Sequence, residues 1–191
     1  TRVAGQGAEG ERAVSFADAY GPSAGSQAAL TNVSSALVID QARGAFTIST
    51  ARTCGGFAEA GTFDAGPLRV SVSGSPATVW VSALDAAEIA ASGRLLLTHL
   101  TDVQNTGVRY AERARKTLLS NGKLPHLVRV GQADVALALK SPESYAVYAL
   151  ATNGRRLEKL TTAVEGGALR FTASVAGGAN GARMLYEIVK E

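Results

Sequence analysis

The chain has 191 residues, of which 46% are hydrophobic and 6% aromatic, so it is long enough for one large domain with a buried core. Its net charge is only +3, and its densest basic cluster, RYAERARK at residues 109–116, contains a glutamate. This charge balance argues against a nucleic-acid-binding protein, which usually presents a basic stripe or a recognised motif. No apolar run approaches the roughly 18 residues that span a bilayer, so a membrane partner is not expected either.

The first 33 residues are rich in glycine, alanine and serine, which is typical of an arm or linker with at most one strand, at residues 12–17. The chain starts at Thr1 rather than methionine and shows no signal peptide, so we expect a piece of something longer. Residues 34–191 show no further boundary and no internal repeat. The sequence therefore predicts an N-terminal arm or linker over residues 1–33 and one domain over residues 34–191.

Alternating apolar and polar residues predict strands along most of that domain. Residues 126–139 are long for one strand, and Gly131 in their middle suggests a bulge or a bend. Helix signals are weak: residues 85–93 could form a short helix, and residues 109–116 could add a turn. The remaining predicted strands are residues 45–50, 68–73, 79–84, 94–100, 168–175 and 184–189.

Turn signals separate these strands, and two of them are Asn-Gly pairs of the kind found in two-residue hairpin turns. Short strands with turns about every ten residues are typical of sandwiches and barrels. The sequence therefore predicts an all-β fold, an antiparallel β-sandwich of the Greek-key or jelly-roll type, with at most one or two short helical turns.

The stretch HLTDVQNTGVRY, residues 99–110, collects residue types that occur in catalytic sites. His99 shares a strand face with apolar residues, and His126 follows a proline at a strand start, so neither has an evident nucleophile to activate. Cys54 is the single cysteine, which excludes an intramolecular disulfide, and we expect an inert thiol. Two histidines and one cysteine do not form a zinc site by themselves. We therefore predict no catalytic residue, metal or cofactor, and interpret the stretch as a strand that enters a turn.

Trp80 falls on the polar face of its predicted strand, opposite the valines. Three interpretations stay open: a second layer covers it, it contacts another domain, or it stacks on a sugar. Tyr110 and Tyr148 are further candidates for ligand or interface contacts.

Two stretches resemble a known family. One is GAFTISTARTCGGF, residues 44–57, and the other is ATVWVSALDAAEIAASGRLLLTHLTDVQNTG, residues 77–107. In order and spacing they resemble the β-sandwich domain found C-terminal to (β/α)8 barrels in bacterial proteins related to glycoside hydrolases. Ala51 and Cys54 depart from the proline and glutamine usual there. The matching positions include Arg52, Thr53, Asp85, Arg94, Asn105, Thr106 and Gly107.

This resemblance implies a non-catalytic accessory sandwich that packs on a catalytic barrel upstream in the same parent chain. It also implies a secreted or periplasmic protein, with an apolar patch on one outer face near Trp80 or the N-terminal arm. Two alternatives stay open. One is a carbohydrate-binding module that binds a polysaccharide, and the other is a hydrolase with a carboxylate pair about 5 to 10 Å apart.

Overall fold

The computed structural model describes residues 30–31, 36–40, 42–177 and 181–191, and it confirms the predicted all-β class. Every strand pairing among these residues is antiparallel. Two short 3-10 turns are the helical segments of the described chain: η1 (Ile89–Ala91) and η2 (Pro142–Ser144).

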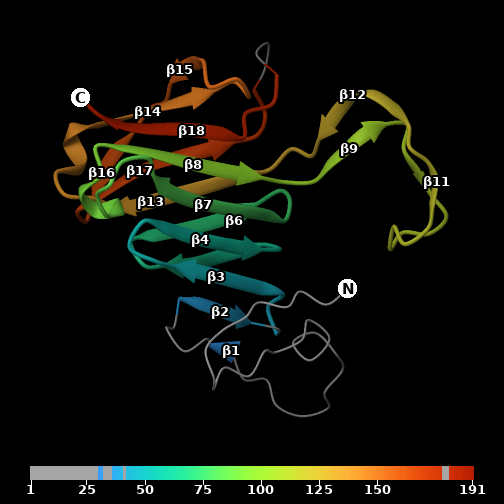
Figure 1. Cartoon of the computed structure of the whole chain (residues 1–191), viewed down its shortest axis with the longest axis horizontal. Helices are drawn as coiled ribbons and strands as arrows, with labels where there is room; N and C mark the ends of the chain where they lie inside the picture. Colours follow the sequence, from blue (N-terminus) through green and yellow to red (C-terminus); the bar gives the residue numbers. More distant parts are fainter. Residues whose placement is uncertain (1–29, 32–35, 41, 178–180) are drawn as a thin grey trace.

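Two sheets form the layers of a sandwich (Figure 1). The strands of the nine-stranded sheet lie in the spatial order β1 (Leu30–Thr31), β2 (Leu37–Asp40), β3 (Ala45–Ser49), β4 (Thr53–Ala58), β7 (Ala77–Ala83), β8 (Arg94–Leu100), β18 (Leu185–Lys190), β14 (Tyr145–Leu150) and β15 (Arg156–Lys159). The strands of the five-stranded sheet lie in the order β16 (Ala163–Glu165), β17 (Ala168–Ser174), β13 (Gln132–Ala138), β6 (Leu68–Ser73) and β5 (Gly61–Ala65).

The hydrophobic core fills the space between these two sheets. Alternation along each strand sends every second side chain inward, so that Val79 and Leu97 of the larger sheet meet Val70 and Leu137 of the smaller one in one buried cluster. The rings of Phe171 on β17 and Tyr186 on β18 lie 6.5 Å apart and join the two layers.

A hairpin extension, residues 102–129, leaves the sandwich after β8 and returns to it before β13 (Figure 1). Its strands pair only with one another, as β9 with β12 and β10 with β11. The four strands are β9 (Val103–Thr106), β10 (Arg109–Tyr110), β11 (Leu118–Ser120) and β12 (Lys123–Val128).

The structure refines three expectations about local structure. Residues 126–139 form two strands rather than one, with a break around Gly131, where a bulge or bend is predicted. The short helix expected over residues 85–93 is only the 3-10 turn η1, and residues 109–116 hold one hydrogen-bonded turn, from the Arg115 amide to the Glu112 backbone oxygen at 3.0 Å. The strand suggested at residues 12–17 lies outside the described residues. The strand predicted at residues 94–100 coincides with β8.

A buried carboxylate ties the far edge of the larger sheet together. Glu187 on β18 is 4% exposed and accepts hydrogen bonds of 2.6 Å from Arg94 on β8 and 2.6 Å from Arg156 on β15. Burial on its own would raise the pKa of Glu187, but the hydrogen bonds from the two arginines outweigh it and lower this pKa. The carboxylate therefore stays charged and connects strands that come from distant parts of the sequence.

Candidate functional site: an apolar sheet face and a hairpin extension

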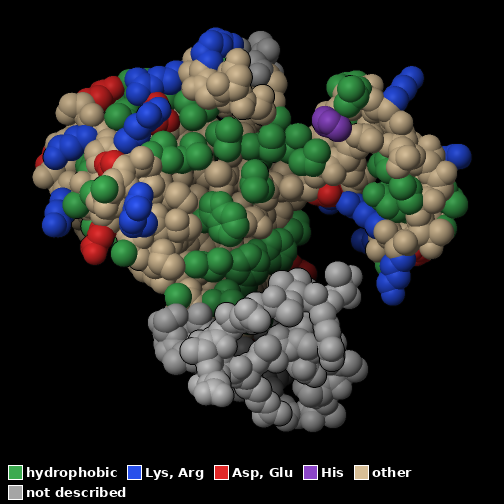
Figure 2. Space-filling model, in the orientation of Figure 1, with side chains coloured by type: hydrophobic (Ala, Val, Ile, Leu, Met, Phe, Trp, Pro, Cys, Tyr) green, Lys and Arg blue, Asp and Glu red, His purple; other side chains and the backbone are tan. Residues whose placement is uncertain are grey.

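The outer face of the nine-stranded sheet carries a band of partly exposed apolar side chains, which we call the Trp80 face. Alternation places Trp80 on this side of β7, because Val79 and Val81 fill the core. Figure 2 shows hydrophobic side chains gathered across the strands of this sheet. The members of the Trp80 face are Phe46, Ile48, Phe57, Trp80, Leu96, Leu100 and Leu185.

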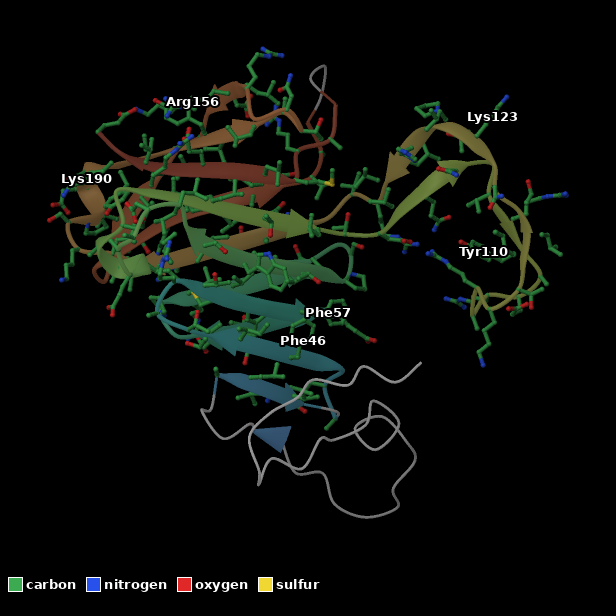
Figure 3. The ribbon with its side chains drawn as sticks, in the orientation of Figure 1. Phe46, Phe57, Tyr110, Lys123, Arg156 and Lys190 are labelled. Carbon is green, nitrogen blue, oxygen red and sulfur yellow. The ribbon has the colours of Figure 1, made fainter. Side chains whose placement is uncertain are left out.

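The backbone of β4 is shaped to accommodate Trp80. Gly55 pairs with Trp80 across the sheet, and a Cβ atom added at Gly55 would lie 2.0 Å from the Cβ of Trp80. Any side chain at position 55 would therefore displace the tryptophan. Beside this pair, the rings of Phe46 and Phe57 stack with their centroids 6.4 Å apart (Figure 3).

The hairpin extension exposes the other large group of apolar side chains. Leu124 is 69% exposed, and five of the nine exposed large hydrophobic residues in the described chain lie in the extension, with a sixth, Val130, directly after it. Exposed apolar side chains concentrated on one protruding element are typical of a surface that contacts another molecule. The five in the extension are Val103, Leu118, Leu119, Leu124 and Leu127.

The extension is also strongly basic compared with the rest of the chain, and Figure 2 shows the basic side chains along it. Its formal charge is +4, from six basic and two acidic residues, whereas the whole chain carries +3. The basic residues are Arg109, Arg113, Arg115, Lys116, Lys123 and Arg129, and the acidic residues are Asp102 and Glu112.

An ion pair folds the tip of the extension back onto its base. Arg115 near the tip makes two hydrogen bonds to the Asp102 carboxylate, of 2.9 and 2.6 Å, and Arg129 adds one of 3.2 Å. The hydrogen bond from Arg115 is the main reason why the pKa of Asp102 falls to about 2. Asp102 therefore holds the extension in shape and is not a free acid or base.

The tyrosine candidates lie far apart and are partly covered. Tyr110 sits on β10 in the extension, with the Arg115 guanidinium 6.0 Å from its ring centroid. Tyr148 sits on β14, and the guanidinium of Arg156 lies 4.1 Å above its ring. A cation already occupies one face of the Tyr148 ring. Trp80, Tyr110 and Tyr148 lie on three different strands, and the structure does not bring them into one stacking platform.

Four of the residues shared with the resembling family meet at one end of the nine-stranded sheet. Arg52 donates a hydrogen bond to the backbone oxygen of Asp85, whose carboxylate accepts bonds from the backbone of Ala87 (3.1 Å) and Gly93 (2.8 Å). Thr53 contacts the hydroxyl of Ser82 at 3.1 Å. Arg94, the fourth, binds Glu187, so all four stabilise local structure.

The other three shared residues shape the extension. Asn105 donates a hydrogen bond of 2.8 Å to the backbone oxygen of Asn121, and its side-chain oxygen lies 2.7 Å from the Nδ1 atom of His126. Thr106 donates a hydrogen bond of 2.7 Å to the backbone oxygen of Pro125. Gly107 has a φ of +73°, a conformation that favours glycine. These residues make the extension, so the stretch interpreted as a strand entering a turn also begins a long protruding hairpin.

The remaining candidates for chemistry are enclosed in the core. His99 is completely buried, and neither of its ring nitrogens has a hydrogen-bond partner among the described residues. Burial lowers its pKa and outweighs the opposing effect of the nearby Ala173 backbone, which favours the neutral ring. Cys54 is also buried, and burial raises the pKa of its thiol to about 12. The described part of the chain holds no group of three or more residues placed to bind a metal ion.

No helix among the described residues is both long and apolar enough to span a bilayer. Comparison with protein-family models, curated proteins and solved structures finds no match for this chain.

Sequence reasoning identified Trp80 but missed the leucines of the extension. Strand β12 has three leucine or valine residues in six, as core strand β6 has, so apolar content alone does not separate Leu124 and Leu127 from buried residues. The basic cluster at residues 109–116 was the one sequence feature that indicated an exposed strand pair. Charged residues are typical of strands that no second sheet covers.

Proposed function

We propose that this chain is a non-catalytic accessory β-sandwich domain that docks on a partner domain through its hairpin extension and its Trp80 face. The observation that carries the proposal is the concentration of exposed apolar side chains on the extension, with Leu124 at 69%. Exposing several leucines on a protruding hairpin costs free energy in water, at roughly 25 cal/mol per Å² of apolar surface. A partner that covers them would recover this free energy on binding.

The chemistry of the two surfaces describes the partner. The extension carries a formal charge of +4, so the facing surface should be acidic and should offer apolar pockets for Leu124 and Leu127. The Trp80 face offers aromatic and aliphatic side chains, which suit packing against another domain of the same protein.

The resemblance of residues 77–107 suggests which partner this is. We propose a (β/α)8 barrel related to glycoside hydrolases, located upstream in the same parent chain, in a secreted or periplasmic bacterial protein. The acid and base carboxylates of such a protein would then belong to the barrel. In this chain the buried carboxylate Glu187 is already bound by two arginines, which supports a structural role for it.

Protection of single introduced cysteines tests this docking. Leu124→Cys probes the extension, and Val164→Cys is the matched control, because Val164 is 45% exposed on the five-stranded sheet. Cys54 is buried and adds little background. We expect both cysteines to react with a maleimide at similar rates in the isolated chain. In the parent protein, position 124 should react at least about tenfold more slowly, because a contact holds it closed.

Two outcomes would contradict the proposal. One is a parent reading frame that encodes no barrel before Thr1. The other is equal labelling of positions 124 and 164 in the intact parent protein, which would mean that nothing covers the extension there.

A further inference from the structure

A groove crosses the outer face of the five-stranded sheet, on the opposite side of the sandwich from the Trp80 face. Its volume is about 630 Å³, which is within the range of ligand-binding clefts. Strands β5, β6, β13 and β17 form the floor, and the segment between β15 and β16 forms one wall. That wall is anchored, because Leu160 donates a backbone hydrogen bond of 2.8 Å to Val147 and packs against the core.

One row of polar side chains crosses the floor. The strand register aligns Thr62, Ser71, Asp134 and Thr172, one from each of four neighbouring strands. Oδ1 of Asp134 accepts hydrogen bonds from Thr172 (2.7 Å) and Gln132 (3.3 Å). Its Oδ2 atom has no hydrogen-bond partner in the described chain. The hydroxyls of Thr62 and Ser71 are likewise unpartnered there. The row therefore presents one free carboxylate oxygen and several hydroxyl groups to a ligand.

A second row lies two residues along the same strands and holds Asp64, Arg69, Ala136 and Arg170, with a formal charge of +1. Ala136 on β13 is flanked in register by Arg69 on β6 and Arg170 on β17. Ala136 is only 9% exposed although its side chain belongs to the outer face of the sheet. The small alanine leaves space between the strands that carry these arginines, whose guanidinium groups contact carboxylates on the outer strands, Asp64 on β5 and Glu165 on β16.

Both arginines keep binding capacity. Arg69 contacts Asp64 at 3.4 Å and Arg170 contacts Glu165 at 3.2 Å, each through a single nitrogen. A guanidinium has five N–H donors, so most of each fork remains available to an anion. The two carboxylates are exposed, and exposed ion pairs of this kind are weak enough for a ligand to displace.

The two rows together define a ligand class. Two residues along a strand span about 6.6 Å, which is close to the width of one sugar ring. A sugar bound across the rows could donate its hydroxyls to Asp134 and place an acidic substituent between Arg69 and Arg170. We propose that this groove binds an anionic oligosaccharide, with the acidic group over Ala136. The proposal is independent of the docking function, because the groove and the extension share no residue.

Isothermal titration of the folded chain with three hexasaccharides tests this site. The probes are hexagalacturonate with carboxylates, a heparin fragment with sulfates, and neutral cellohexaose. We expect one of the two anionic probes to bind at least about tenfold more tightly than cellohexaose, because charge-assisted hydrogen bonds are the stronger kind. The anionic probe that binds identifies the acidic substituent.

Two substitutions on one strand form a matched pair. Ala136→Leu adds bulk to the floor of the groove between the strands of Arg69 and Arg170, whereas Ala138→Leu adds the same bulk on the same face of β13, outside the groove. We expect Ala136→Leu to weaken binding by on the order of tenfold or more, and Ala138→Leu to leave it within about twofold. Arg170→Gln should also weaken binding of the anionic probe, and it avoids added bulk if Ala136→Leu fails to fold.

Three results would overturn the proposal. They are the absence of binding by both anionic probes, equal binding of cellohexaose, and anionic binding that persists in both Ala136→Leu and Arg170→Gln. The last result would assign the binding to another basic surface, such as the extension.

Discussion

His99 is a polar side chain that the fold encloses without giving it a hydrogen-bond partner among the described residues. Burial lowers its pKa below the ordinary value of 6.5 in the folded chain, while the unfolded chain titrates near 6.5. Below that pH the unfolded state binds more protons than the folded state, so the free energy of unfolding falls as the pH falls.

Urea unfolding at pH 7.5 and pH 5.5 measures this effect. We expect the chain to lose stability between these values, with a limiting slope of about 1.4 kcal/mol per pH unit for one proton. His99→Leu removes the titrating group and should flatten the slope. Identical pH dependence in both proteins would exclude His99 as its source.

Cys54 makes a second prediction at the residue scale. Its thiol is buried and has a pKa raised to about 12, so it should hold almost no thiolate at pH 8. We expect no reaction with Ellman's reagent in the folded chain over an hour, and one equivalent after unfolding in urea. Rapid reaction of the folded chain would show that strand β4 opens readily.

The ion pairs of Asp102 should hold the hairpin extension in its folded conformation. Asp102→Asn should loosen the hairpin, because it removes the bidentate partner of Arg115. Hydrogen exchange should therefore quicken in residues 103–128, while exchange in β8 stays unchanged. The effect on the melting temperature should be small, since ion pairs at partly exposed positions contribute about 0–1 kcal/mol. Faster exchange throughout the sandwich would contradict this local role.

The same carboxylate gives the extension a pH dependence. The pKa of Asp102 is lowered to about 2 from 3.8, first by the hydrogen bond from Arg115. Its stabilising contribution is present above pH 3.8 and is lost as the pH falls toward 2. Hydrogen exchange in the extension at pH 2.5 and at pH 4.5 should reveal this loss, after correction for intrinsic exchange rates, and Asp102→Asn should not show it.

At the element scale, the sequence predicted strands more reliably than it predicted their partners. Alternation identified β6 and β17, because each has one buried face. It could not distinguish β12 from β13, since apolar content says nothing about whether a second sheet covers a strand. Gly131 was the one local sign of the break between them. The extension could not be predicted from local patterns, because it is defined by the pairing of β9 with β12 and of β10 with β11, and strand pairing is a long-range property.

For the whole molecule, the hairpin extension is separable from the core. No residue of the hydrophobic core cluster lies between Leu97 and Ala133 in the described chain. The two ends of the extension also meet, because Arg129 donates a backbone hydrogen bond of 2.8 Å to Asp102. We therefore expect that replacing residues 103–128 with Asn-Gly, a two-residue hairpin turn, leaves a folded sandwich.

Thermal unfolding followed by circular dichroism checks this deletion. The melting temperature should change by only a few degrees, since 1 kcal/mol corresponds to about 2–4 °C for a chain of this size. Loss of cooperative melting would mean that the extension is part of the folding unit.

The groove is a property of the whole molecule that sequence reasoning did not find. Its residues come from five strands and one loop, so Arg69 and Arg170 are distant in sequence and reach the two sides of Ala136 only through strand register. The Trp80 face was partly predicted, because alternation alone puts Trp80 opposite the valines. What covers either surface depends on other molecules, which a single sequence does not describe.

The route of the chain through the extension has a mechanical consequence. The extension connects β8 to β13, and each of these strands has a hydrogen-bonded neighbour on both sides of its own sheet. A force applied to the extension would therefore load interior strands of both layers at once. Rupture would require many backbone hydrogen bonds to break together rather than one after another. A partner bound to the extension could therefore pull on this domain without unfolding it. Unfolding the sandwich by pulling on the extension should need more force than unfolding it by pulling on the edge strand β15.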